Sequence, residues 1–223
     1  MFKDALMLAP KFQKLTEWPR RESYYVGVDL AKSVDRTCLT TIHKREWKTL
    51  KGWKSSYTVT NITQFPPKLE YLEQAKRISE YLDKDTFRDV KVHACVDASG
   101  VGAPVAEILR DEFGLKFRPI VITSGDGKKN NRYSRNWLIT NLAIWLRKPN
   151  FKVPMDLEEA GALRREVEAI EEVESQSGTI IYKVNTPHDD RLMSLCLALL
   201  GCTRSEAFSS GVTDIFFSHL RLT

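Results

Sequence analysis

The chain has 223 residues, 42% of them hydrophobic and 28% charged, so it is long enough for one well-cored domain of ordinary globular composition. Its 34 lysines and arginines exceed its 29 aspartates and glutamates, and the net charge of +5 suits a polyanionic partner. The sequence contains neither an apolar run of the roughly 18–20 residues that a membrane span needs nor the apolar core of a signal peptide, which predicts a cytoplasmic protein without membrane contact.

Met1–Glu22 carry two prolines and scattered charges without a clean period, which predicts a lead-in or linker. After it, β-branched runs predict strands, and apolar residues spaced by three and four predict helices. In chain order the expected elements are strands at Tyr24–Leu30, Arg36–His43 and Trp53–Ile62, a helix at Leu69–Leu82, a strand at Val90–Val96, a helix at Ala103–Phe113, a strand at Phe117–Ile122, helices at Tyr133–Leu146 and Leu157–Val173, a strand at Thr179–Val184 and a helix at His188–Leu200.

This order predicts an α/β fold, with a mixed sheet flanked by helices. The second strand is suited to lie antiparallel to the first, so an antiparallel meander forms one side of the sheet and parallel strands the other. We expect one domain over residues 23–203, followed by a C-terminal tail over residues 204–223 of uncertain structure.

Two other groups of residues favour structural roles. The four cysteines form no C-x-x-C pair, and three of them lie in apolar runs, so we expect buried thiols. The helix expected at Leu157–Val173 is rich in glutamate, and we interpret its acidic side as a solvated face rather than a set of metal ligands. Its glutamates are Glu158, Glu159, Glu166, Glu168, Glu171 and Glu172.

Aspartates stand at the ends of two predicted strands and at the start of a helix. Asp29 and Asp97 end strands, and the Asp189/Asp190 pair opens the last helix. The carboxyl ends of parallel strands are where ligands gather in α/β sheets, and carboxylate oxygens are ligands for Mg²⁺ and Mn²⁺. Taken singly, each aspartate is more typical of a turn or helix cap, but together they predict a metal site. Asp35 is either a further ligand or a turn residue.

A polar loop between the fifth strand and the next helix is strongly basic. Its cations suit contacts to DNA phosphates that do not read the base sequence, although a solvated loop is the plainer interpretation. They are Lys128, Lys129, Arg132 and Arg135. Lys32, close to Asp29, would neutralise phosphate charge or face solvent. His188 would assist a phosphate or hold a ligand, or have only a capping or surface role.

Three short blocks, in this order and on these elements, resemble the nuclease domain of phage large terminase subunits. They are Val26–Ala31 followed by Asp35, then Val96–Gly102, then His188–Asp190 at the start of an apolar helix. The likeness spans Tyr24 to about Leu200 and implies a ribonuclease-H-like fold. It also implies that Asp29, Asp97 and one of the Asp189/Asp190 pair bind two Mg²⁺ or Mn²⁺ ions that promote hydrolysis of a DNA phosphodiester.

Within the resemblance, Asp189 is favoured over Asp190 as a ligand, but consecutive helical residues point about 100° apart, so the sequence leaves the choice open. The implied function is an endonuclease of viral DNA packaging with little sequence specificity, acting in the infected bacterial cytoplasm. Its implied partners are double-stranded DNA, a terminase ATPase region, a small terminase subunit and a portal. The ATPase signature G-x-x-x-x-G-K-[ST] does not occur in this sequence.

Two other functions remain open from the sequence. One is a junction resolvase or transposase-like nuclease of the same fold, which would prefer branched DNA or transposon ends. The other is a non-catalytic nucleic-acid-binding module in which the aspartates are structural caps. Divalent metal should stabilise a nuclease of either kind and leave the binding module unchanged.

Overall fold

The computed structural model describes residues 20–30, 36–100, 102–124, 128–129, 131–174, 178 and 180–209. The strands of its larger sheet are β1 (Arg20–Asp29), β2 (Cys38–Thr49), β3 (Gly52–Gln64), β4 (Lys91–Asp97), β5 (Arg118–Thr123), β6 (Lys128–Lys129), β7 (Arg132–Ser134) and β8 (Phe151–Lys152). Strands β9 (Ile170–Glu174) and β10 (Ile180–Val184) form a separate antiparallel pair. The helices are α1 (Tyr71–Leu82), α2 (Gly102–Asp111), α3 (Arg135–Leu146), α4 (Ala160–Glu168) and α5 (Asp190–Ser209), with a 3-10 turn at Asp85–Phe87.

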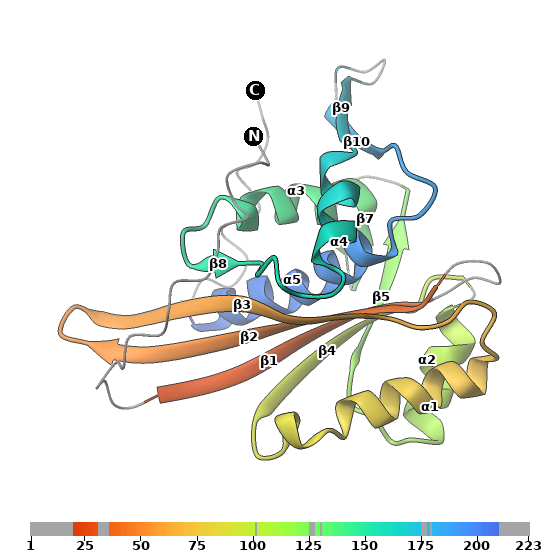
Figure 1. Cartoon of the computed structure of the whole chain (residues 1–223), viewed down its shortest axis with the longest axis horizontal. Helices are drawn as coiled ribbons and strands as arrows, with labels where there is room; N and C mark the ends of the chain where they lie inside the picture. The colour runs from red at the N-terminus through yellow and green to blue at the C-terminus, as the bar shows by residue number, and fades with distance from the viewer. Residues whose placement is uncertain are drawn as a thin grey trace.

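The larger sheet is mixed, as predicted. Its strands follow the order β6-β7-β5-β4-β1-β2-β3-β8. Strands β1, β2 and β3 form the antiparallel meander, whereas β4 runs parallel to β1 and β5 parallel to β4. Helices cover both faces, with α1 and α2 on one side and α3, α4 and α5 on the other (Figure 1). The prediction of an α/β mixed sheet, with an antiparallel meander and parallel strands flanked by helices, is therefore confirmed.

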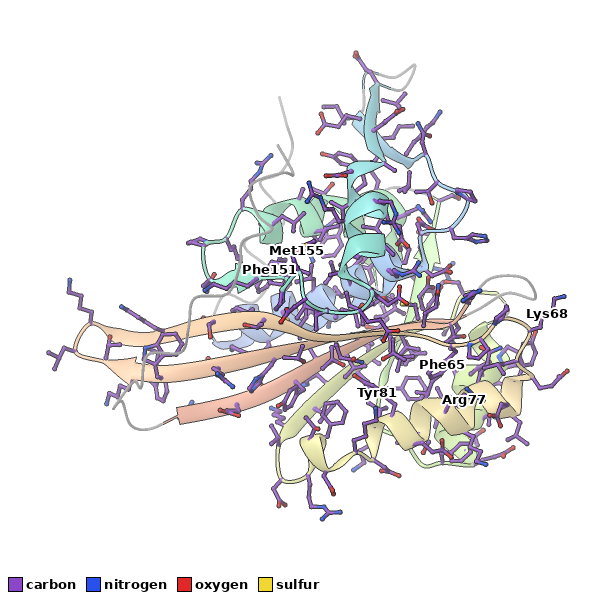
Figure 2. The ribbon with its side chains drawn as sticks, viewed as in Figure 1. Phe65, Lys68, Arg77, Tyr81, Phe151 and Met155 are labelled. Carbon is purple, nitrogen blue, oxygen red and sulfur yellow. The ribbon has the colours of Figure 1, made fainter. Side chains whose placement is uncertain are left out.

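Each face of the sheet has its own apolar core, because side chains alternate along a strand. In β1, Tyr25 belongs to the core under α5, whereas Val26 and Val28 belong to the core under α1 and α2. Figure 2 shows the same division, with Phe65 and Tyr81 on the α1 side and Phe151 on the opposite side. Ser23 and Gly27, two positions before and after Tyr25 in β1, therefore lie on the α5 side of the sheet.

Helix α5 lies unusually close to the backbone of β1 at Gly27. A Cβ atom on Gly27 would stand 2.0 Å from the carbonyl oxygen of Ser194 and 2.4 Å from the backbone nitrogen of Ala198. Both neighbours are helix backbone, which cannot move aside as a flexible side chain can. Glycine at this position therefore sets how near the start of α5 lies to the end of β1.

We expect Gly27→Ala to lower the free energy of unfolding by about 2–3 kcal/mol, because the added methyl group forces two packed backbones apart. Urea titration of the purified chain measures this change. The matched control is Gly161→Ala in α4, whose nearest neighbour would be the tip of Arg165 at 3.9 Å. The control should be neutral or slightly stabilising. Equal stability of the two variants would contradict the role assigned to Gly27.

Several expected boundaries differ from the structure. The helix predicted over Leu157–Val173 ends at Glu168, and Ile170–Glu174 forms β9 instead. Pairing with β10, which supplies a partner for its backbone hydrogen bonds, overrides the helical pattern there. Strand β1 begins at Arg20, inside the predicted lead-in, because β2 continues to Thr49 and pairs with it. Helix α5 continues past Leu200 to Ser209.

The four cysteines are buried and free, as predicted. Among the described helices, none has both the length and the apolar character of a membrane span.

Candidate nuclease site

Terminal residues of four neighbouring strands lie in a row at one edge of the sheet. Asp29 pairs with Cys38 of β2, and Cys38 pairs with Gln64 of β3. On the other side of β1, the last paired residues are Val28 and Val96, so Asp29 and Asp97 are the next residues of the two parallel strands. The structure thus brings Asp29 and Asp97 together at the same edge.

Both carboxylates belong to the α5 side of the sheet. Asp29 follows Tyr25 and Gly27 at two-residue intervals, and Asp97 follows Cys95 in the same way. Tyr25 and Cys95 lie in the core under α5, and side chains two apart on a strand share a face. The two aspartates are partly exposed, unlike the buried valines beside them.

The loop after β4 is fixed around Asp97. The Asp97 carboxylate accepts a hydrogen bond of 2.8 Å from the backbone N–H of Ser99, and the Ser99 hydroxyl accepts one of 2.7 Å from the N–H of Ile122 in β5. A Cβ atom on Gly102 would stand 2.4 Å from the Asp97 carbonyl oxygen. Gly102 therefore allows α2 to begin directly beside the strand end.

Asp190 begins α5 above this row. Its side chain is 9% exposed, and the amide of Gln64 donates a hydrogen bond of 3.5 Å to its carboxylate. Because Gln64 is in register with Cys38 and Asp29, the contact places Asp190 over the strand ends. Acidic residues of three elements, β1, β4 and α5, therefore lie at one edge of the sheet.

Asp189 has a different environment from Asp190. Its carboxylate forms an ion pair with the guanidinium of Arg135, the first residue of α3. The sequence predicted Arg135 to contact DNA and favoured Asp189 as a metal ligand. Arg135 and Asp189 therefore bind each other. Of the two adjacent aspartates, Asp190 is the one whose carboxylate contacts a residue at the strand ends, Gln64.

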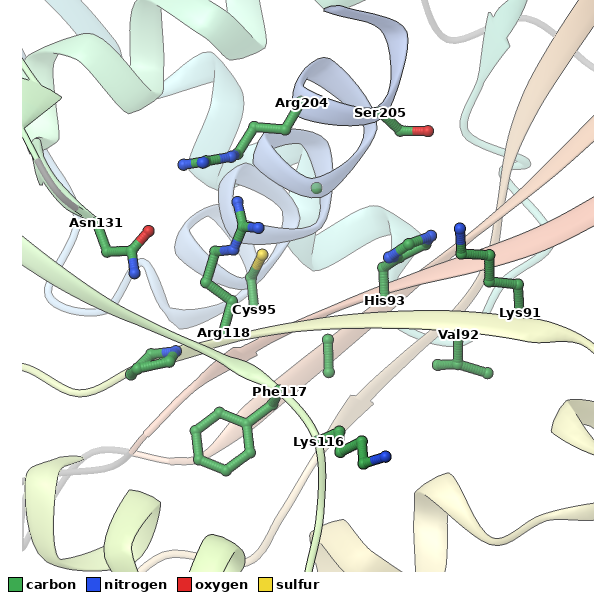
Figure 3. Close-up of a pocket in the computed structure, with 13 residues that line it drawn as sticks. Lys91, Val92, His93, Cys95, Lys116, Phe117, Arg118, Asn131, Arg204 and Ser205 are labelled. Carbon is green, nitrogen blue, oxygen red and sulfur yellow. The ribbon is translucent and has the colours of Figure 1, made fainter. Parts of the chain in front are cut away.

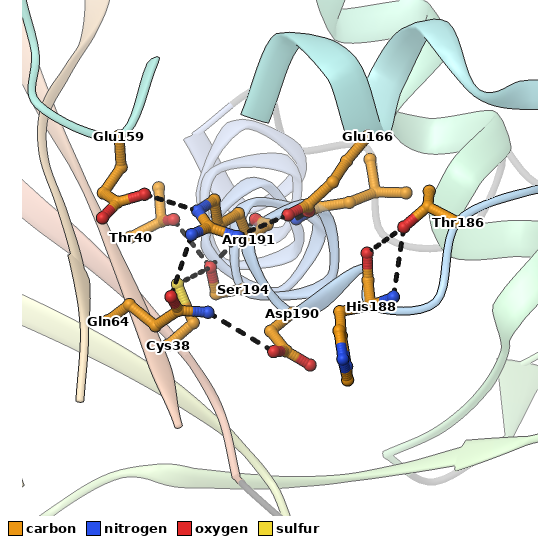
Figure 4. A network of polar contacts seen from close by, with 11 residues as sticks. Cys38, Thr40, Gln64, Glu159, Glu166, Thr186, His188, Asp190, Arg191 and Ser194 are labelled. Atoms are coloured by element: carbon orange, nitrogen blue, oxygen red, sulfur yellow. Dashed lines mark hydrogen bonds and ion pairs between the residues drawn. The ribbon is translucent and has the colours of Figure 1, made fainter. Parts of the chain in front are cut away.

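Arg191 is the centre of a network that joins α5 to α4 and β3 (Figure 4). Its guanidinium donates hydrogen bonds to Glu159 at 2.7 Å, to Glu166 at 2.8 Å and to the side-chain oxygen of Gln64 at 2.8 Å. Glu166 also accepts a bond of 2.8 Å from the backbone N–H of Leu192. Gln64 thus bridges Arg191 and Asp190, so the network holds the start of α5 in place.

The expectation that this acidic segment is a solvated face is wrong for two of its glutamates. Glu166 is only 5% exposed, and Glu159 is held by Arg191. The pKa of Glu166 is raised overall, mainly by burial and also by the charge of Asp190. Hydrogen bonds from Leu192 and Arg191 lower the pKa and offset part of this rise. Sequence carried a signal for Glu166, because it falls between Leu163 and Val167 on the buried stripe of α4.

Buried thiols line the inner side of the site. Burial raises the pKa of Cys38 to about 12, and the charge of Asp29 adds to this shift. The pKa of Cys196 is also raised to about 12, first by burial and then by Asp29. Both thiols are therefore protonated at neutral pH.

The chemistry of these donors fits a hard divalent cation, since Mg²⁺ and Mn²⁺ prefer carboxylate oxygens and retain water positions for a phosphate. Asp29, Asp97 and Asp190 supply such oxygens from three separate elements. Within the described ranges, however, no three acidic, histidine or cysteine side chains are close enough together to enclose an ion.

The other predicted site residues are spread more widely. Arg132 is exposed on β7, and His188 is exposed just before α5, where its backbone bonds with the Thr186 hydroxyl. Lys128 and Lys129 form β6, but the placement of their side chains lies outside the described structure. Lys32 and Asp35 also lie outside the described residues.

Comparison with known proteins gives a likeness in structure alone. No protein-family model and no curated protein matches the chain. The large terminase nuclease from thermophilic phage G20c, crystallised with bound magnesium, superposes with a TM-score of 0.61 at 21% identity, covering 89% of this chain and 94% of that one. The large terminase nuclease domain of Thermus phage P74-26 gives 0.56 at 19% identity, over 88% and 91%.

The chain has the terminase-nuclease fold. The fold extends over nearly the whole length of both compared domains, so the resemblance carried by three short sequence blocks is confirmed at the level of the fold. The G20c nuclease has also been crystallised with bound cobalt. At this identity the comparison establishes the terminase-nuclease architecture, and the roles of individual side chains rest on the geometry above.

Proposed function

We propose that the chain is a metal-dependent endonuclease domain that hydrolyses DNA phosphodiester bonds with little sequence specificity. The observation that carries this proposal is the gathering of Asp29, Asp97 and Asp190 at one edge of the sheet, from two parallel strand ends and a helix start. Likeness to terminase nucleases crystallised with divalent metals supports it.

Asp29, Asp97 and Asp190 are the proposed holders of Mg²⁺ or Mn²⁺, as a pair of ions. Bound divalent ions supply an activated water and stabilise the charge on the leaving oxygen. The protein's own contribution is to orient the carboxylates. Asp97 is held by Ser99, and Asp190 is held through Gln64 by the Arg191 network. We prefer Asp190 to Asp189 because Arg135 already neutralises Asp189.

We propose Arg132, which is exposed on β7, for a phosphate contact, with Lys128, Lys129 and Lys32 as further proposals from the sequence. We also propose His188, exposed beside Asp189, as an assisting group, and Asp35 as a further ligand. We propose that the domain acts in the packaging of viral DNA in the infected bacterial cytoplasm. Its partners there would be double-stranded DNA, a terminase ATPase region, a small terminase subunit and a portal.

Plasmid cleavage tests the proposal. Supercoiled DNA should be nicked and then linearised in Mg²⁺ or Mn²⁺, and it should stay intact in EDTA. Either metal should also raise the melting temperature, because ions that bind the folded state alone stabilise it. No cleavage and no thermal shift with either metal would reject the nuclease in favour of a binding module. Faster cutting of a four-way junction than of linear DNA would favour a resolvase.

A further inference from the structure

A basic pocket lies along β4, from Lys91 to Cys95. Strand β5 pairs with β4 only from Cys95 to Asp97, so no described strand covers Lys91–Ala94 on the side away from β1. The gap is part of a cavity of about 770 Å³, which is also lined by Gly201, Arg204 and Ser205 in the C-terminal part of α5 (Figure 3). The lining runs along β4 from Lys91, roughly 20 Å from Asp97 along the strand, to Cys95, two residues before Asp97. None of the three aspartates of the proposed nuclease site lines the cavity, so the two sites are distinct.

Four cations from three segments surround this cavity. Lys91 comes from β4, Lys116 and Arg118 from the entry to β5, and Arg204 from α5. None of the residues that line the cavity is acidic. Nor does any carboxylate in the described part of the chain form an ion pair with these four cations. Lys91, Lys116 and Arg204 are exposed, and Arg118 is partly buried.

The wall of the pocket is preformed. The Arg204 guanidinium donates a hydrogen bond of 2.6 Å to the hydroxyl of Tyr133, which fixes its side chain. His93 stacks on Tyr25 with ring centroids 5.0 Å apart and an interplanar angle of 11°. Burial lowers the pKa of His93, and the charges of Lys91, Arg118 and Lys44 lower it further, which reflects the positive potential inside the pocket.

We propose that this pocket binds phosphate groups. Like charges held together without a counter-charge destabilise one another, and a bound anion relieves that repulsion. Guanidinium groups such as those of Arg118 and Arg204 match the geometry of phosphate oxygens, and lysine ammonium groups add point charges. A phosphate source is favoured over an acidic peptide because the proposed substrate is itself a phosphodiester polymer. To this extent the inference rests on the proposed function.

The phosphate belongs either to a nucleic-acid backbone, several nucleotides from the cleaved bond, or to a free phosphate compound. Binding of a fluorescein-labelled DNA duplex, followed by anisotropy in EDTA over a series of salt concentrations, tests the first source. The test variant is Lys91→Gln/Lys116→Gln, which removes two exposed charges and leaves the core intact. The matched control is Lys76→Gln/Lys84→Gln, on the α1 side of the sheet.

If DNA occupies the pocket, the test variant should bind about tenfold more weakly at 0.1 M salt, and its slope of log affinity against log salt should fall by up to about two. The control should match the wild type. If inorganic phosphate is the ligand, it should raise the melting temperature of the wild type and of the control but not of the test variant, while duplex binding is unchanged.

The proposal is overturned if the test variant equals the control in both assays. Because EDTA prevents metal-dependent cleavage, this test is independent of nuclease activity. If the wild type never cuts DNA and the test variant binds the duplex more weakly, the nuclease is rejected and the pocket is retained. Normal cleavage by the wild type, together with unchanged duplex binding and an unchanged phosphate-induced thermal shift in the test variant, would retain the nuclease and reject the pocket.

Discussion

Replacing Asp29 or Asp97 with asparagine should slow metal-dependent plasmid cleavage by roughly a thousandfold, because removal of one charged group that supports the reaction commonly costs that much. Asparagine keeps the shape of the side chain and removes the negative charge that attracts a divalent ion. Both variants should also lose most of the rise in melting temperature that Mn²⁺ gives the wild type. The measurements are cleavage rates in Mn²⁺ and thermal melting with and without the metal.

The matched control for these variants is Asp111→Asn, an exposed aspartate on α2 that pairs with Arg110. It should cut as fast as the wild type. Asp190→Asn should behave like Asp29→Asn, whereas Asp189→Asn should retain more activity because Asp189 is paired with Arg135. Full cleavage by Asp29→Asn and Asp97→Asn, with both variants folded, would remove these residues from the site.

Arg191→Ala should lower the free energy of unfolding by about 3–5 kcal/mol, the usual cost of leaving a buried charge without its partner. Glu166, at 5% exposure, would lose the guanidinium bond and keep only the Leu192 N–H. Gln64 would lose its bond to Arg191, so the contact that holds Asp190 would loosen. Denaturant titration measures the stability, and the cleavage rate of the folded variant measures the effect on the site.

Arg164→Ala is the control for this prediction. Arg164 pairs with Glu168 four residues along α4, and both side chains are well exposed. Such surface pairs contribute about 0.3–0.5 kcal/mol, so this variant should be nearly as stable as the wild type. A further variant, Arg191→Ala/Glu166→Gln, should recover part of the lost stability because the unpaired buried charge is gone. If Arg191→Ala were no less stable than Arg164→Ala, the network would not be what positions α5.

The positions of Asp29 and Asp97 in the candidate site could be predicted because their signals are local. A strand that ends in an acid is visible in a short stretch of residues, and Asp29 and Asp97 both have this pattern. The choice between Asp189 and Asp190 was not available from the sequence, since it depends on where α3 begins and which residue of β3 meets α5. These contacts join residues far apart in the chain.

The role of Glu166 and Arg191 was missed for a related reason. A charged residue on a helix is usually solvated, and only a partner on another element makes its burial favourable. That partner is 25 residues away in the chain. Strand β9 was missed because its glutamates continued a helical pattern, while the pairing that decides its structure comes from β10.

By itself, the sequence determined the order of the main strands and helices, the mixed sheet and the strand ends that carry Asp29 and Asp97. These follow from periodicity and residue type, which act over a few positions. Tertiary structure alone decided that Arg135 neutralises Asp189, that Arg191 and Gln64 hold the start of α5, and that the short β5 leaves a basic pocket beside Lys91. Each of these results depends on the distances between elements. Packing and strand register determine those distances, and local residue patterns carry no information about them.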